Sequence, residues 1–389
     1  MNIRYFIIIL IIFFECCTQQ KQNIPEEEFY EIDLEQCLKS EQQVLLSDIA
    51  DTIEYLELKT PRGIIISGIK DVIFVNEFLF FRAGGFVYKF LRNGQFVCQI
   101  GSKGRGPGEY QAITSLYIDE INKEIVVGAI ETVLFYSFEG IFLRSLRRSC
   151  MGLIFSDSVM WTAITPGSWQ KYQAIAFAPS GDTCAYISNG NFGKSRMNGG
   201  IYFLQISHNR CPFYKYNGSV YFKGFEDNDT IWKLSGHQAK PYVYLNLGRY
   251  KLPYEFTIGY SAEAFEKHAI KYMSVPVIAE EKNYFFFIAL NRKVGALNYL
   301  AFDKRIGKGF NVSDGKAVGI TDNILGGPHL LLVQESDKYF FDVVEGVDLL
   351  ENIEQNQYTP IPEFKKQLET ISENTNQLII LCHKKNIQL

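Results

Sequence analysis

A glycine-rich segment is the clearest candidate for anion binding in this sequence. Residues Gly101–Tyr110 read GSKGRGPGEY, with Arg105 and Glu109 placed among the glycines. Consecutive backbone N–H groups in such a loop can form a concave anion site, and Arg105 would add a positive charge. The Gly-Lys-Ser/Thr sequence of a P-loop and the dinucleotide glycine spacing are both absent. The alternative is a tight connection between two sheets, in which Glu109 and Arg105 pair locally and Tyr110 packs as a ring.

The histidines and serines show no pattern of a common hydrolase. No HExxH motif or helical i, i+4 pair occurs among the five histidines, which are His208, His237, His268, His329 and His383. We retain His329 as a ligand-binding candidate because it follows the Gly-Gly-Pro turn at 326–328. A GxSxG nucleophile elbow is also absent. Asp227-Asn228-Asp229 does not continue into a twelve-residue Ca²⁺ loop, so we interpret it as a hairpin turn.

The strands that position these residues follow a repeat. Five residues recur 46 positions later: Val87, Phe90, Gly94, Phe96 and Ile100 return as Val133, Tyr136, Gly140, Phe142 and Leu146. A fixed period of short strands and glycine turns is typical of β-propeller blades. The first blade is predicted at Ile64–Ile69, Val72–Asn76, Leu79–Arg82, Val87–Leu91 and Phe96–Ile100. The second is predicted at Ile113–Asp119, Glu124–Gly128, Val133–Ser137 and Phe142–Leu146.

Beyond Arg148 the period decays, but strand-like runs continue to the C-terminus. They lie at Ala174–Phe177, Cys184–Ile187, Ile201–Ile206, Val220–Gly224, Thr230–Leu234, Tyr242–Leu247, Tyr284–Leu290, Leu297–Phe302, Tyr339–Val344 and Leu378–Cys382. Helices are predicted at Ser261–Met273 and Pro362–Ile371. We therefore expect an all-β propeller with short helical insertions over residues 41–389, because stacked blades bury their faces only against one another.

Three carboxylates fall near the ends of predicted inner strands, where the central channel would lie. Asp71, Asp119 and Asp322 are therefore weak candidates for a Ca²⁺ or catalytic metal site. Our main expectation is that the protein has neither a metal site nor a cofactor. An Asp at such a position more often caps a turn through its own backbone, which is the alternative that we favour.

Composition argues for a large packed core and against nucleic-acid binding. Apolar residues make up 47% of the chain and aromatic residues 15%, while the net charge is −4. The only basic cluster is Arg144, Arg147 and Arg148, which is too small for a nucleic-acid surface. After the N-terminal pair, the cysteines form no CxxC motif and permit no disulfide assignment: Cys37, Cys98, Cys150, Cys184, Cys211 and Cys382.

The N-terminus has the pattern of an export signal that ends in a cysteine. An apolar run of ten residues, Tyr5–Phe14, follows Arg4 and is too short to span a bilayer. The polar sequence after Cys16 and Cys17 resembles that of a lipoprotein. We assign the lipid to Cys17, with Cys16 as the alternative, because cleavage before Cys17 leaves a small residue at the cut. A plain secretory signal is the other interpretation. Residues 1–17 are thus predicted as signal peptide and 18–40 as tether and lead-in.

Four segments resemble the six-bladed β-propeller lipoproteins of Bacteroidetes, which are similar to NHL-repeat propellers. They are GRGPGEY at 104–110, LRNGQFVCQIG at 91–101, DTIWKL at 229–234 with PYVYLNLG at 241–248, and the loop containing Asp322-Asn323 and Gly326-Gly327-Pro328. The resemblance covers about residues 24–385 and implies six blades and an envelope location, on the outer membrane.

The resemblance implies no defined chemistry, so two functions remain open. The first is a lipid-anchored binding module for a glycan, a peptide or a partner lipoprotein, with Arg105, Glu109, Tyr110, Asp322 and His329 as candidate ligand residues. The second is a metal-dependent hydrolase or lyase at the channel. The enzyme requires three or more acidic, Asn or His side chains to converge on the axis, whereas the binding module requires an aromatic and polar patch at one end of the ring.

Overall fold

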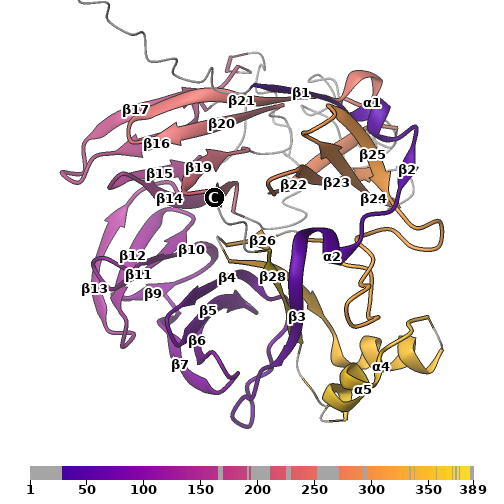
Figure 1. Cartoon of the computed structure of the whole chain (residues 1–389). Coiled ribbons are helices and arrows are strands. Elements are labelled where there is room, and N and C mark those ends of the chain that lie inside the picture. Colours follow the sequence, from indigo (N-terminus) through magenta and orange to yellow (C-terminus); the bar gives the residue numbers. More distant parts are fainter. Residues whose placement is uncertain are drawn as a thin grey trace, which may run out of the picture.

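The computed structural model is a ring of sheets around a central axis (Figure 1). It describes residues 29–164, 170–190, 192–193, 211–224, 229–251, 271–291, 296–332, 334–336, 338–355, 357–369, 371–372, 375 and 377–385. The predicted strand Ile201–Ile206 and the predicted helix Ser261–Met273 lie outside these residues, apart from the last three residues of the helix.

Six sheets of four or five strands form the six blades of a β-propeller. Blade 1 contains β4 (Lys70–Val75), β5 (Phe78–Ala83), β6 (Phe86–Leu91) and β7 (Phe96–Ile100). Blade 2 contains β10 (Ile113–Asp119), β11 (Glu124–Ala129), β12 (Thr132–Ser137) and β13 (Phe142–Arg147). Blade 3 contains β14 (Gly152–Ser156), β15 (Val159–Ala163), β16 (Tyr172–Phe177) and β17 (Thr183–Ser188). The predicted all-β propeller is confirmed.

The other three blades each include a strand from the N-terminal segment. Blade 4 contains β18 (Phe213–Tyr216), β19 (Ser219–Phe222), β20 (Thr230–Ser235), β21 (Gln238–Asn246) and β1 (Tyr30–Asp33). Blade 5 contains β22 (Met273–Glu280), β23 (Tyr284–Asn291), β24 (Ala296–Asp303), β25 (Lys308–Val312) and β2 (Glu41–Gln42). Blade 6 contains β26 (Gln334–Glu335), β27 (Tyr339–Val344), β28 (Leu378–Lys384) and β3 (Ala50–Glu57).

This N-terminal segment runs around the outside of the ring and closes it. β1 pairs in parallel with β21, and β2 pairs in parallel with β25. The short helices α1 (Leu34–Cys37) and α2 (Leu46–Ile49) follow these two strands. β3 then pairs antiparallel with β28, so the chain's start and end share one blade (indigo beside yellow in Figure 1). Strand β1 lies within the predicted lead-in, so residues of that segment are part of the sheet structure.

One predicted strand is wrong. Residues 64–69 form no strand, because this segment crosses from β3 of blade 6 to β4 of blade 1 without a neighbouring strand. Positive φ angles at Gly63 (89°) and Gly68 (65°) bend it at both ends. Ile66 and Ile69 are nevertheless buried between the two blades, which explains why the apolar pattern resembled that of a strand.

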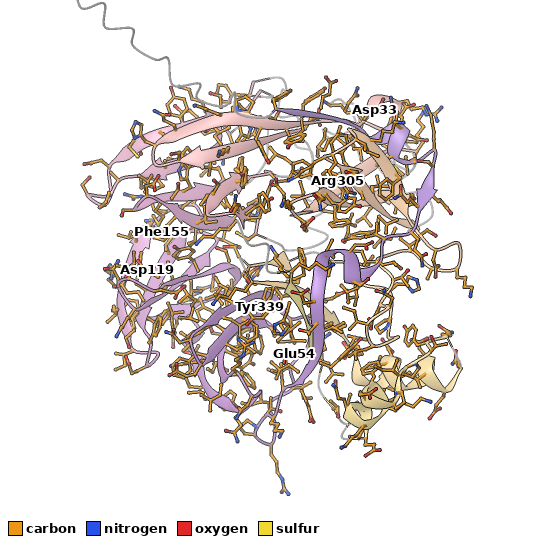
Figure 2. All side chains as sticks on the ribbon, viewed as in Figure 1. Asp33, Glu54, Asp119, Phe155, Arg305 and Tyr339 are labelled. Atoms are coloured by element: carbon orange, nitrogen blue, oxygen red, sulfur yellow. The ribbon has the colours of Figure 1, made fainter. Side chains whose placement is uncertain are left out.

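The core consists of six apolar clusters, one between each pair of neighbouring blades. Figure 2 shows side chains filling the space between the ribbons of the blades. Successive residues of a strand face opposite sides of the sheet, so one strand supplies two clusters. In β5, Leu79 and Phe81 pack toward blade 6, while Phe80 packs toward blade 2. Burial on both faces explains why such strands are continuous apolar runs rather than alternating ones.

Two helices in the connection between β27 and β28 cover one side of blade 6 (Figure 1). They are α4 (Gly346–Glu354) and α5 (Pro362–Leu368). Helix α5 confirms the predicted helix over residues 362–368, and its Phe364 is fully buried with its ring 4.5 Å from that of Tyr55. A short 3₁₀ helix, η1 (Gly248–Tyr250), follows β21. No helix among the described residues is long and apolar enough to cross a membrane.

Candidate functional site

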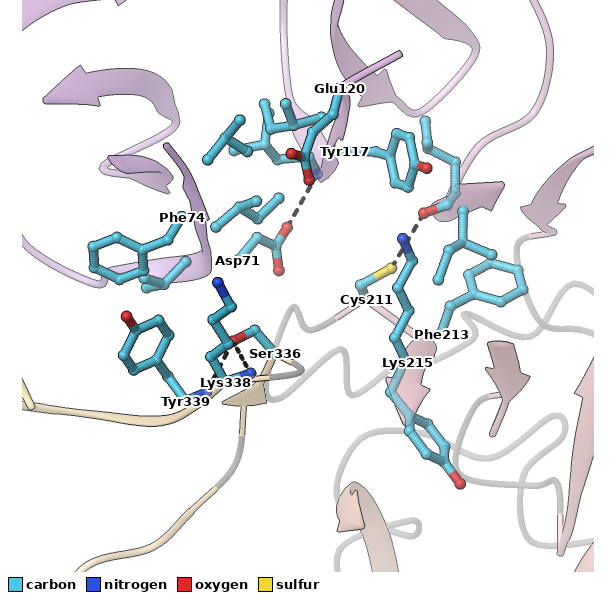
Figure 3. Close-up of a pocket in the computed structure, with 18 of the residues that line it drawn as sticks. Asp71, Phe74, Tyr117, Glu120, Cys211, Phe213, Lys215, Ser336, Lys338 and Tyr339 are labelled. Atoms are coloured by element: carbon cyan, nitrogen blue, oxygen red, sulfur yellow. Dashed lines mark hydrogen bonds between the residues drawn. The ribbon is translucent and has the colours of Figure 1, made fainter. Parts of the chain in front are cut away.

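All six blades border one cavity on the axis, with a volume of about 490 Å³ (Figure 3). β4, β10, β14, β18 and β22 contribute to its wall, and blade 6 contributes through the turn between β26 and β27. In every blade the first strand lies nearest the axis and the later strands lie farther out, so these inner strands all run in the same direction along the axis. Residues at the ends of different inner strands are therefore brought together.

The hairpin turns gather most of the charged groups at one end of the cavity. Strands alternate in direction within a blade, so the turns after the first and third strands lie at the same end. We call this the turn end, and it is formed by Asn76, Arg92, Glu120, Lys215 and Lys338. The aromatic residues Phe74, Tyr117 and Tyr339 line the cavity beside it.

Aromatic rings hold two of these cations. The Arg92 guanidinium lies 5.1 Å from the ring centroids of both Phe74 and Tyr339, and it donates a hydrogen bond to the Tyr339 hydroxyl at 2.7 Å. The Lys215 ammonium lies 5.0 Å from the Tyr117 ring. Burial, followed by the charges of Asp119 and Glu120, raises the pKa of Tyr117 to about 12. Its hydroxyl therefore stays protonated at neutral pH.

Near the opposite end of the cavity, a buried ion pair within blade 1 forms hydrogen bonds to blade 2. Asp71 pairs with Arg82, and their side chains are only 10% and 7% exposed. Asp71 also accepts a hydrogen bond from the Leu116 N–H at 3.2 Å, and Arg82 donates to the Ile113 carbonyl at 3.1 Å. Asp71 lies in the channel wall as the sequence suggested, but its carboxylate joins two blades.

Cys211 is the cysteine in this wall. Its Sγ lies 3.7 Å from the Leu153 carbonyl oxygen, in hydrogen-bonding geometry. Burial and the nearby negative charge of Asp71 raise the pKa of the Cys211 thiol to about 12. The thiol is therefore protonated at neutral pH and is not an activated nucleophile. All six cysteines in the described part of the chain are free thiols.

The glycine-rich loop holds its own carboxylate where an external anion would bind. β8 (Ser102–Lys103) and β9 (Glu109–Tyr110) pair in parallel, and the Gly106 N–H donates to Glu109 Oε2 at 2.7 Å. A Cβ on Gly104 would lie 1.9 Å from that same oxygen, so the glycine is required for the approach. Glu109 makes this backbone contact and no ion pair with Arg105, which is exposed.

The Tyr110 ring packs between blades 1 and 2. Its hydroxyl donates to the Ile100 carbonyl at 2.7 Å, and the ring is 2% exposed. Burial raises the pKa of Tyr110 to about 12. Gly101–Tyr110 thus connects two blades through internal hydrogen bonds, and its residues are not among those that line the axial cavity.

The other carboxylate candidates cap turns. Asp119 accepts hydrogen bonds from the backbone N–H groups of Ile121 and Asn122 at 3.1 and 3.0 Å. Asp322 is buried and accepts from the backbone N–H groups of three residues, each at 2.9 Å: Ile324, Leu325 and Gly327. Within the described residues, no group of three or more His, Cys, Asp or Glu side chains is arranged to hold a metal ion.

His329 lies within hydrogen-bonding distance of Asp314 in the loop before β26. Its Nε2 lies 3.0 Å from Asp314 Oδ2. The backbone N–H groups of Ala317 and Lys316, with a further contribution from His329, lower the pKa of Asp314 to about 2. This arrangement holds the loop before β26, and the structure does not bring His329, Asp322 and the glycine-rich loop together at the cavity.

Sequence reasoning missed the residues at the turn end. The 46-residue repeat contained a partial signal, because it aligns Asp71 with Tyr117 and Phe74 with Glu120, and all four line the cavity. Lys215 and Lys338 belong to blades 4 and 6, where the repeat is no longer visible. No local pattern could have placed them beside Arg92.

Comparison with solved structures supports the same fold. A protein from Bacteroides fragilis NCTC 9343, described as exported, matches with a TM-score of 0.69 and 17% identity, over 92% of this chain and all of the other. A member of the DUF4221 family from Bacteroides vulgatus matches with a TM-score of 0.49 and 13% identity, over 86% and 97% of the two chains. At 17% identity, the likeness to the Bacteroides fragilis protein concerns the fold alone.

Sequence comparison identifies the family. No curated protein sequence matches the chain. The family model described as Domain of unknown function (DUF4934) matches residues 29–383, which include all six blades and the N-terminal strands that close the ring. The chain is therefore a member of the DUF4934 family.

Proposed function

We propose that this propeller is a binding protein of the cell envelope and that its ligand is a small molecule held in the axial cavity. The observation that carries the proposal is the cavity itself, where the inner edges of all six blades meet. Its volume of about 490 Å³ falls within the range of small-molecule sites, which is roughly 300–1,000 Å³.

The composition of the wall supports binding. Ile73, Ile118, Ile154 and Ile278 form apolar parts of the wall, while the turn end presents charged and aromatic groups. Small-molecule sites combine an apolar wall with a few polar groups that fix the orientation of the ligand. The described residues do not bring together the carboxylates that the metal-dependent alternative requires.

A pair of matched substitutions tests the location of the site. Glu120→Trp places a bulky ring at the turn end, whereas Glu131→Trp makes the same change in an exposed turn of blade 2 that does not line the cavity. We expect Glu120→Trp to abolish the binding of any small molecule found by calorimetry of the full chain in detergent. Glu131→Trp should leave it unchanged. Equal binding by both variants would refute the proposed site.

We also propose that the protein is a lipoprotein anchored to the outer membrane through Cys17, as in the NHL-like lipoprotein family that its sequence resembles. This proposal rests on the apolar run Tyr5–Phe14 and the cysteine pair after it, which lie outside the described residues. Incorporation of radioactive palmitate should be lost in Cys17→Ser and retained in Cys16→Ser. The opposite pattern would move the lipid to Cys16, and absence of label from the unmodified protein would indicate a plain secretory signal.

A further inference from the structure

The axial cavity carries an excess of positive charge within an acidic protein. Four cationic residues line it, Arg92, Lys215, Lys223 and Lys338, against the two carboxylates of Asp71 and Glu120. The whole chain has a net charge of −4. Asp71 is already paired with Arg82, so its charge offsets little of this excess.

Two of the cations at the turn end are available to a ligand. Lys215 and Lys338 are exposed to solvent, and neither forms an ion pair with a carboxylate of the described residues. They come from different blades, and Figure 3 shows both side chains reaching into the cavity. A lysine ammonium has three donors and therefore favours an anionic or strongly polar acceptor.

Arg92 adds a third cation in a fixed position. Its contacts with the Phe74 and Tyr339 rings and its hydrogen bond to Tyr339 restrict the guanidinium plane. Its contact with Glu54 is looser, at 3.7 Å between side chains that are 39% and 49% exposed. A planar guanidinium with free N–H groups suits the paired oxygens of a carboxylate or an ester of phosphate or sulfate.

We infer that the ligand of the axial cavity is a small organic anion, with its acidic group at the turn end and its apolar or ring-shaped part against the isoleucine-lined wall. This inference rests on the proposed binding function and specifies the chemistry of that same site. A concave site whose walls have a low dielectric focuses the field of the three cations on an entering anion. Glu120 supplies one acceptor at the same end for a hydroxyl or amide N–H of the ligand.

Matched acid and neutral probes test the inference by calorimetry at about 20 mM salt. The pairs are glucuronate with glucuronamide, N-acetylphenylalanine with its amide, and glucose 6-phosphate with glucose. In at least one pair we expect the acid to bind ~10-fold or more tightly than its neutral partner, and this preference should fall at about 300 mM salt. The pair that binds identifies whether a sugar acid, a peptide carboxylate or a phosphate ester is the source of the anion.

Two double variants provide the control. Lys215→Gln/Lys338→Gln should lower the acid-to-neutral ratio to the part that Arg92 alone sustains, while Lys39→Gln/Lys59→Gln removes the same charge outside the cavity and should preserve the ratio. If neutral probes bind as tightly as the acids and Glu120→Trp abolishes their binding, the inference is overturned but the proposed function stands. Failure of every acid to bind would also overturn it. Binding that Glu120→Trp does not affect would instead refute the cavity as the site.

Discussion

Asp71→Asn tests whether the acidic residue in the channel wall holds blades 1 and 2 together. Asp71 has a φ angle of 51°, which Asn adopts more readily than most residues. The substitution therefore removes the charge without adding backbone strain. Arg82 would remain 7% exposed and would lose its ionic partner.

The expected cost follows from two contributions. Removing one partner of a buried ion pair typically costs about 3–5 kcal/mol, because the remaining charge is left uncompensated. The Asn carbonyl oxygen can still accept from Arg82 or from the Leu116 N–H, which recovers about 1 kcal/mol. We therefore expect Asp71→Asn to lower the free energy of unfolding by about 3 kcal/mol, which a domain stable by about 5–15 kcal/mol survives.

Urea unfolding followed by circular dichroism measures this change, with Asp119→Asn as the matched control. Asp119 caps an exposed turn, and Asn caps such turns nearly as well, so the control should cost less than about 1 kcal/mol. Hydrogen exchange should also show faster opening at the Leu116 amide in Asp71→Asn. A cost for Asp71→Asn within about 0.5 kcal/mol of zero, or below that of Asp119→Asn, would refute the reasoning.

Three further predictions concern local contacts. Gly104→Ala should destabilise the protein by about 1–2 kcal/mol, because the new methyl group displaces Glu109. In a Glu109→Ala background the same substitution should cost nothing further in urea unfolding. Additive costs of the two substitutions would show that this contact is irrelevant. The pKa of Asp314 is lowered to about 2, so its carboxylate stabilises the fold above about pH 4 and this contribution is lost as the pH falls toward 2. The Asp314→Asn variant lacks this contribution, so between about pH 4 and about pH 2 its free energy of unfolding should fall by up to about 2 kcal/mol less than that of the unmodified protein. An unchanged dependence of stability on pH would contradict this role of Asp314. Ile32→Ala removes a fully buried side chain of β1 and should cost about 3 kcal/mol in the same urea assay, whereas a neutral result would mean that β1 is dispensable.

Blades 1 and 2 were predictable because their contacts are local. Consecutive strands pair through short hairpins, and Gly94 and Gly140 adopt the positive φ angles of 83° and 84° that their turns require. The predicted strand Ile113–Asp119 coincides with β10. Strands β14 and β15 of blade 3 were missed, because strands buried on both faces show no alternation and the repeat had already decayed.

The candidate site was predicted less well than the fold. Asp71 was placed near the channel, but its partner Arg82 was not identified, and Asp119 and Asp322 cap turns as the alternative interpretation expected. The cations of the turn end come from strands that are separated by more than a hundred residues in the sequence. Their proximity depends on how many blades close the ring.

By itself, the sequence determined the all-β class and the hairpins of the repeating blades, since these depend on local composition and on neighbouring residues. The tertiary structure decided the closure of the ring, where β3 pairs with β28 and β1 with β21. It also decided where the axial cavity lies and which charged side chains line it. Pairing between distant segments depends on which strand edges and apolar faces remain uncovered after the local hairpins have formed, and no local pattern records that.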